Sequence, residues 1–295
     1  MSYLLHYYLL CLKDRMMNNI SCLVLGYFFI SIFSCSRNER TVKSEVTQIV
    51  AKDIIVSEFQ LNKLNDSIPK NVHKLITEYD KVIGYENNYI IFKDGSKLLY
   101  DDKKEKNYYQ LLNSPDIEDQ FKYEYSYKGA NIPKNHDPGR IRNEEFFKKI
   151  YGKNKQEVRK KLVEVVWCPK LVNQKILIST ENNVHLKVVL LSKELDKHPE
   201  FIKYLTNIGG TFNWRKISGT DRLSMHSFGV AIDINVSQSN YWKWDYKSDN
   251  KNINLSYRNR IPLELVKIFE KYGFIWGGNW YHYDTMHFEY RPELL

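Results

Sequence analysis

Residues 224–235 read SMHSFGVAIDIN, and residues 284–289, close to the C-terminus, read DTMHFE. Together the two stretches offer two imidazoles and two aspartate carboxylates, a set of side chains that suits a hydrolytic zinc site. A catalytic zinc ion takes three protein ligands from His, Asp, Glu or Cys and keeps one position open for water. The two stretches therefore predict a metal site together with the strands that support it.

The first stretch has the pattern of a turn followed by a β-strand. Gly229 permits a tight turn, and from Val230 to Asn235 apolar residues alternate with the others, which is the period of a strand. The apolar set can face the core while Asp233 points to the opposite face. His226, seven residues earlier, lies in the loop and can fold back towards Asp233, so the pattern predicts two metal ligands at one place.

The second stretch predicts another strand. Residues 286–290 alternate in the same way, with His287 and Glu289 on one face, and His287 is the expected third ligand. Asp284 lies three residues earlier, where a carboxylate can reach the metal-bound water without binding the metal, the position of a general base. Glu289 is expected either to orient an imidazole or to form a structural ion pair with Arg291.

The patterns S-x-H-x-x-G-x-A-x-D and D-x-x-H resemble the M15 family of zinc peptidases, the D-alanyl-D-alanine carboxypeptidase and L,D-endopeptidase group. The resemblance covers roughly residues 160–295. Residues 276–280 (WGGNW) and 287–292 (HFEYRP) are similar to subfamily C of this family, which includes phage endolysins and bacterial L-alanyl-D-glutamate peptidases. Residues 210–215 (GTFNWR) resemble the family segment that carries an active-site arginine, here Arg215.

The resemblance implies a role for each site residue. Zn²⁺ would be held by His226, Asp233 and His287, where it lowers the pKa of a bound water. Asp284 would be the general base, and Arg215 would bind the scissile carbonyl or stabilise the tetrahedral oxyanion.

The implied substrate is a peptide stem of peptidoglycan. The subfamily segments favour an L-alanyl-D-glutamate endopeptidase, and a D-alanyl-D-alanine carboxypeptidase is the alternative. A third interpretation is a cell-wall-binding lipoprotein with little catalysis, against which the intact Asp284 argues.

The order of elements predicts the fold class. Strands and helices are mixed without a regular βαβ repeat, which favours an α+β domain with a small antiparallel sheet flanked by helices. The resemblance implies the same, in the hedgehog or D-Ala-D-Ala peptidase-like form. We expect strands at 162–167 and 175–179, a strand or its end at 211–215, and helices at 184–195, at 199–206 (ended by 208–210) and at 262–272.

The chain divides by composition into four parts: a signal or anchor region at 1–35, a linker at 36–70, a small accessory region at 71–155, and the peptidase domain at 156–295. In the accessory region we expect a hairpin of strands 89–92 and 97–100 around an Asp-Gly turn and a helix at 144–151. His136 and Asp137 lie in a loop with Pro and Gly, where a lone surface histidine is favoured over a second metal site. The role of this region is open.

The N-terminus has the pattern of a targeting signal. An apolar run at 20–34 is short for a membrane span, which needs about 20 residues, and suits a signal peptide. Its end, residues 32–36 (IFSCS), resembles a lipobox, so we expect lipidation at Cys35. An uncleaved anchor is the alternative, and Met16 or Met17 is an alternative start. With a lipidated Cys35 or with an uncleaved anchor, we expect the rest of the chain to be exported to the periplasm or cell envelope and anchored to the membrane.

The composition is ordinary for a globular protein, with 43% hydrophobic and 27% charged residues. The net charge of +9 favours anionic partners such as cell-wall polymers, lipid headgroups or nucleic acid, but codon usage in an AT-rich genome explains it as well. Because export conflicts with nucleic-acid binding and no motif for it is present, we expect no nucleic-acid partner, and we expect a monomer. Cys168 is expected to be a buried side chain outside any disulfide.

Overall fold

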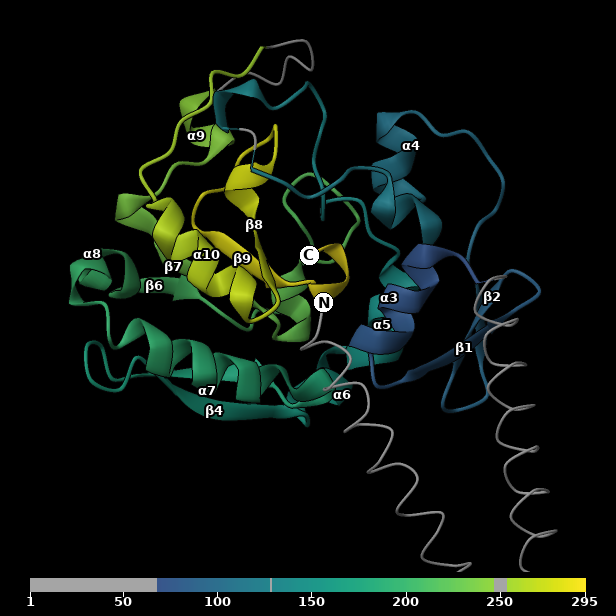
Figure 1. The fold of residues 1–295 in the computed structure, drawn as a ribbon, viewed down its shortest axis with the longest axis horizontal. Helices are drawn as coiled ribbons and strands as arrows, with labels where there is room; N and C mark the ends of the chain where they lie inside the picture. Colours follow the sequence, from purple (N-terminus) through teal and green to yellow (C-terminus); the bar gives the residue numbers. More distant parts are fainter. Residues whose placement is uncertain (1–67, 128, 247–253) are drawn as a thin grey trace, which may run out of the picture. The chain divides into compact units, whose positions relative to one another are not determined.

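The structure, a computed structural model, describes residues 68–127, 129–246 and 254–295. Ile68–Leu295 form one compact unit of mixed α+β class, and the described residues build three small antiparallel sheets (Figure 1). No helix in these ranges is long and apolar enough to cross a membrane. The predicted signal or anchor region at 1–35, with Cys35, and nearly all of the linker predicted at 36–70 lie outside the described residues.

The first sheet belongs to the predicted accessory region. Its strands, in the order β1-β2-β3, are β1 (Val82–Glu86), β2 (Tyr89–Phe92) and β3 (Lys97–Leu99). The predicted hairpin is confirmed, with Ile90 opposite Leu98. The helices of this part of the chain are α3 (Lys70–Glu78), α4 (Tyr108–Asn113), α5 (Glu144–Tyr151) and α6 (Lys155–Arg159). Helix α5 has the predicted bounds because Asn143 caps it, accepting a hydrogen bond from the Phe146 backbone at 2.9 Å.

The second sheet is a hairpin of β4 (Leu162–Trp167) and β5 (Gln174–Ser179). Helix α7 (Val184–Leu195) lies alongside β4 (Figure 1). These three elements were predicted within one residue of their bounds. Cys168, just after β4, is buried and free, as predicted.

The third sheet has four antiparallel strands in the order β6-β7-β9-β8. They are β6 (Ile208–Gly210), β7 (Ala231–Asn235), β9 (His287–Tyr290) and β8 (Phe274–Trp276). Helix α10 (Leu263–Lys271) packs on one face of this sheet, where the rings of Phe269 and Phe288 stack with centroids 3.9 Å apart. The other face is left for the polar side chains of β7 and β9.

Two predictions around β6 are wrong. Ile208–Gly210 forms the edge strand β6 instead of ending a helix, and the preceding helix is divided into a 3₁₀ turn (Pro199–Phe201) and α8 (Ile202–Leu205). Residues 211–215 form no strand. The physical reason is strand pairing. Gly210 lies opposite Asp233, so β6 is formed by its hydrogen bonds with β7, which the sequence of residues 208–210 does not indicate.

The largest hydrophobic cluster of the described residues joins the early and late parts of the chain. Phe147 of α5 contacts Phe228 with ring centroids 6.2 Å apart, and the Arg291 guanidinium lies 4.8 Å from the Phe147 ring centroid. The accessory region therefore packs directly against the segment that carries the predicted metal ligands. The boundary at 155–156 stays a prediction.

Candidate metal centre

His226 lies in a 3₁₀ turn, Met225–Phe228, directly before β7. Ser224 caps this turn, accepting a hydrogen bond from the His226 backbone at 3.4 Å. Gly229 ends it with φ 69°, and a Cβ atom there would lie 2.5 Å from Leu162 Cδ2. Only glycine combines this backbone conformation with this close approach, so the turn folds His226 back over β7 as the sequence predicts.

Asp233 and His287 are direct partners on the two central strands, β7 and β9. Side chains of directly opposite residues lie on the same face of a sheet and touch. Ala231 lies opposite Glu289 in the same register, so Glu289 is the next side chain on the face of His287. The predicted strand period therefore places both carboxylates and the imidazole on the polar face of the sheet.

Three ligand atoms converge at this place. Asp233 Oδ1 lies 3.1 Å from His226 Nε2 and 3.0 Å from His287 Nδ1, and the two nitrogens are 3.2 Å apart. In a tetrahedral zinc site with bonds of about 2.1 Å, neighbouring ligand atoms are about 3.4 Å apart. The three atoms thus have nearly the spacing of a metal-ligand triangle, and the group can hold a metal ion.

The outer nitrogens of the two imidazoles have other partners. His226 Nδ1 lies 2.7 Å from the Thr211 carbonyl oxygen, and His287 Nε2 lies 2.9 Å from Glu289 Oε2. Both partners are acceptors, so each outer nitrogen donates its proton and each inner nitrogen of the neutral ring presents a lone pair.

Three lone pairs, one of them on a carboxylate, therefore face one another in a nearly closed space. This arrangement is repulsive unless a cation or a proton lies between them. The donor set of two imidazoles and one carboxylate fits Zn²⁺, so the residues present fit the metal that the resemblance implies.

The protonation of the cluster reflects the same surplus of acceptors. Burial alone would lower the pKa of His287, but its hydrogen bonds with Asp233 and Glu289 outweigh burial and raise this pKa to about 10. Burial would raise the pKa of Asp233, but the charges and hydrogen bonds of the two histidines lower it. The pKa of Glu289 is lowered to about 2, against burial, by the hydrogen bond with His287 and the charge of Arg142. Without a metal, a proton on His287 takes the place of the cation.

Asp284 lies three residues before His287, in the turn that leads into β9. The residue is half-buried, and its Oδ1 is buried and has no hydrogen-bond partner among the described residues. Burial, followed by the neighbouring charge of Asp233, raises the pKa of Asp284 to about 7. A carboxyl group that titrates near neutrality beside the cluster has the property that a general base or acid needs.

The glycines of the WGGNW segment hold Asp284 in place. The Asp284 backbone N–H donates to the Gly277 carbonyl at 3.0 Å, and a Cβ at Gly277 would lie 2.5 Å from the Asp284 carbonyl oxygen. A Cβ at Gly278 would lie 2.1 Å from the ring of Trp276, whose Nε1 donates to the Thr285 carbonyl at 2.9 Å. The segment therefore supports the base through packing.

Arg215 is held next to the His226 turn through its main chain. Its N–H donates to Ser227 Oγ at 3.0 Å, and its carbonyl accepts from the Ser224 N–H at 3.0 Å. Its side chain is exposed. Burial raises the pKa of Tyr241, and the Arg215 charge acts in the opposite direction. Tyr241 itself pairs with Asp284 in an isolated β-bridge. The structure thus leaves the guanidinium open to a ligand near the site, and its catalytic role stays a prediction.

Glu289 has the partner that was expected from sequence, Arg291, and others that were not. Arg291 donates from Nη1 to the Gly139 carbonyl at 3.0 Å and also lies 3.3 Å from Glu289 Oε1, so both roles weighed for Glu289 are realised. Arg142 Nη1 lies 3.9 Å from Glu289 Oε2. Gly139 and Arg142 are about 150 residues earlier in the chain than Glu289, and no local pattern indicates such a contact.

One expectation for a neighbouring residue is corrected. His136 is buried, with Nε2 3.0 Å from the Glu124 carbonyl, so it is not a lone surface histidine. Asp137 is buried as well, lies 2.6 Å from His282 Nδ1 and forms an ion pair with Arg140 at 2.9 Å, which balances its charge.

The comparison with known proteins agrees with this geometry. Residues 218–290 match an M15 peptidase family model described as D-alanyl-D-alanine carboxypeptidase. No curated protein and no solved structure matches the chain. The matched range contains His226, Asp233, Asp284 and His287, and residues 218–290 of this chain are therefore an M15 peptidase domain, of a metallopeptidase family.

Proposed function

We propose that this protein is a zinc-dependent peptidase that hydrolyses the stem peptides of peptidoglycan. One observation carries the proposal: Asp233 Oδ1, His226 Nε2 and His287 Nδ1 converge within 3.0–3.2 Å while both imidazoles donate outward. The M15 match supports a peptide substrate. We also propose that the domain around the sheet β6-β7-β9-β8 has the hedgehog or D-Ala-D-Ala peptidase-like fold.

Each residue would have a separate task. A bound Zn²⁺ would supply a Lewis acid that polarises the scissile carbonyl and activates water. Asp284, with its unpartnered Oδ1 and its pKa near 7, accepts a proton from the attacking water and passes it to the leaving amine. Arg215, exposed beside the His226 turn, contacts the carbonyl oxygen as negative charge develops on it. Glu289 keeps the Nδ1 lone pair of His287 pointed inward.

The favoured bond is the one between L-alanine and D-glutamate. The similarity of WGGNW and HFEYRP to the endopeptidase-like subfamily supports this choice, and the description of the matched family supports the alternative, a D-alanyl-D-alanine carboxypeptidase. A wall-binding protein with little catalysis is the second alternative, and the intact Asp284 argues against it.

We propose further that the chain is exported, is anchored to the membrane through lipidated Cys35 or an uncleaved N-terminal segment, and acts as a monomer. The apolar run at 20–34 and the lipobox-like residues 32–36 support the anchor.

The test is mass spectrometry of purified peptidoglycan incubated with the protein, with a chelator and with Asp284→Asn as controls. New stem fragments that disappear in both controls are expected, and their masses identify the bond. The same fragments in the presence of the chelator would contradict a metallopeptidase. No fragments from a folded, zinc-loaded protein would favour the binding protein.

A further inference from the structure

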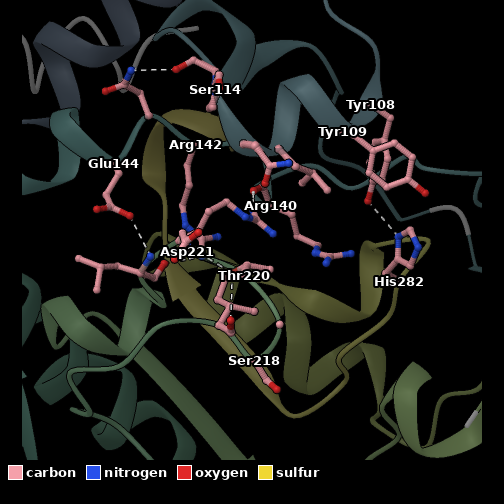
Figure 2. Close-up of a pocket in the computed structure, with 18 of the residues that line it drawn as sticks. Tyr108, Tyr109, Ser114, Arg140, Arg142, Glu144, Ser218, Thr220, Asp221 and His282 are labelled. Carbon is pink, nitrogen blue, oxygen red and sulfur yellow. Dashed lines mark hydrogen bonds between the residues drawn. The ribbon is translucent and has the colours of Figure 1, made fainter. Parts of the chain in front are cut away.

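A cleft of about 1110 Å³ lies beside the candidate metal centre and is not explained by the proposed hydrolysis. Figure 2 shows part of its lining: Tyr108, Tyr109 and His282 stand at one end, Arg140 and Arg142 at the centre, and Ser218, Thr220 and Asp221 along one wall. None of the three predicted metal ligands is among the residues that line it. A large part of its wall comes from the accessory region, outside the range matched by the peptidase family.

Three arginines meet in this cleft: Arg140, Arg142 and Arg222. Arg140 has a carboxylate partner, Asp137, at 2.9 Å. Arg142 donates to two carbonyl oxygens, those of Gly139 at 3.3 Å and Leu223 at 3.2 Å, and lies 3.9 Å from the nearest oxygen of Glu289. The charge of Arg142 is therefore only partly neutralised by direct contact.

Arg222 is the least satisfied of the three. Its Nη1 donates to the Arg140 carbonyl at 3.1 Å, whereas its Nε is buried and has no hydrogen-bond partner among the described residues. It forms no ion pair with any residue in the described ranges. Burial and the charges of Arg142 and Arg140 lower the pKa of Arg222 to about 9, so the chain alone leaves this cation in an unfavourable place.

The carboxylates along the cleft are engaged by other cations. Glu144 and Glu145 contact Lys148 at 2.8 and 2.9 Å, and Asp221, which is 99% exposed, contacts Lys216 at 2.7 Å. The centre of the cleft therefore keeps an excess of positive charge. A partly buried guanidinium without a counter-charge is costly, because desolvation is not offset by pairing.

We propose that this cleft binds an oxyanion, a carboxylate or a phosphate group, through Arg140, Arg142 and Arg222. Guanidinium forks match the two oxygens of a carboxylate or phosphate, and hydrogen bonds between charged groups are the stronger ones. The site is separate from the metal ligands and does not depend on the proposed hydrolysis.

The test measures binding by calorimetry with the full chain at constant ionic strength. The probes are inorganic phosphate, succinate and the uncharged analogue succinamide. The uncharged chelator 1,10-phenanthroline is present, so that no anion binds through a metal. The variant is Arg222→Gln, and the matched control is Arg159→Gln, which removes one exposed positive charge from α6, away from the cleft.

We expect phosphate, succinate or both to bind the wild type and the control equally, and to bind Arg222→Gln at least about tenfold more weakly. Whichever anion binds identifies the chemical class. We also expect Arg222→Gln to be as stable as the wild type without an anion, because it loses repulsion from Arg140 and Arg142.

The proposal is overturned if neither anion binds the wild type, or if Arg222→Gln binds as tightly as the wild type does. If Arg222→Gln does not fold, the wild type decides: binding of succinate without binding of succinamide supports the site, and equal binding of the two overturns it.

Discussion

Among the residues that the structure describes, two clusters of acidic and histidine side chains have the spacing of a metal site, and they differ in the cation that each already holds. The first is Asp233 with His226 and His287. The second lies in the accessory region around Asp116, with Asp101, Asp102, Glu118 and Asp119.

The second cluster already contains a cation. Lys106 Nζ lies 3.0 Å from Asp102, 3.0 Å from Asp116 and 2.5 Å from Asp119, and its side chain is 6% exposed. In the first cluster Asp233 contacts only the two histidines among the described residues, and without a metal the cation is a proton on His287. Spacing alone therefore does not identify a metal site; a proton that a metal ion can displace does. We expect zinc at the first cluster and none at the second.

The largest effect is expected when a ligand is removed from the first cluster. His287→Ala deletes one of three donors and leaves Asp233 and His226 without a metal-binding geometry. We expect hydrolysis of peptidoglycan to become undetectable while the protein remains folded, measured by fragment release and circular dichroism. Activity close to that of the wild type would show that the cluster is not the catalytic centre.

Asp284→Asn tests the neighbouring base without removing a donor. General acid–base groups contribute about 10²–10⁴-fold to the rate, so we expect a loss of that size in hydrolysis with zinc content unchanged, measured by metal analysis of the purified variant. Asp80→Asn, at an exposed site, is the control. A loss of zinc together with activity would make Asp284 a ligand instead of a base.

Lys106→Met tests the second cluster, around Asp116, by removing its cation. Removing the cation from a buried ion-pair cluster costs about 3–5 kcal/mol, so we expect a clear fall in the free energy of unfolding, measured with urea. Zinc content should not change. A loss of zinc in this variant would contradict the assignment of the metal to the first cluster. Lys103→Met, whose side chain is 75% exposed, should have little effect.

Glu289→Gln removes the carboxylate that accepts a hydrogen bond from the predicted metal ligand His287. Partners that orient a metal-bound imidazole contribute about 10–100-fold to metal affinity, so a fall of that size in zinc affinity is expected from competition with a fluorescent chelator. An unchanged zinc affinity would mean that Glu289 pairs with Arg142 and Arg291 but does not orient His287.

The smallest effect concerns pH. The pKa of His287 in the metal-free protein is raised to about 10, so at any pH below this value zinc displaces a proton from the cluster. Zinc affinity should therefore decrease as the pH falls. One competing proton lowers the affinity by about tenfold for each pH unit. Affinity that stays constant between pH 6 and 8 would remove His287 from the ligand set.

The sequence predicted the metal-site strands well because a period of two is local information. Once Val230–Asn235 alternates, Asp233 must lie on the polar face, and the same holds for His287. The register that makes them partners is not local, but the resemblance implied that they meet. Helix α7 and hairpin β4–β5 were also predicted from local sequence.

The features of the fold and the site that the sequence did not predict depend on contacts between distant segments. Strand β6 contains two glycines and is ordered by pairing with β7, so its sequence resembled a helix end. The buried His136 and the approach of Arg142 to Glu289 depend on how the accessory region packs. Tyr283 is fully buried and donates to Asp245 at 2.6 Å, whereas Tyr281, two residues earlier, lines the cleft, and the sequence does not distinguish the two.

The most direct test of the central claim is a calorimetric titration of the metal-free wild-type chain with Zn²⁺. The account predicts one equivalent bound per chain, with uptake lost in Asp233→Ala and kept in Lys106→Met. No uptake by the wild type, or uptake that survives in Asp233→Ala, would contradict it.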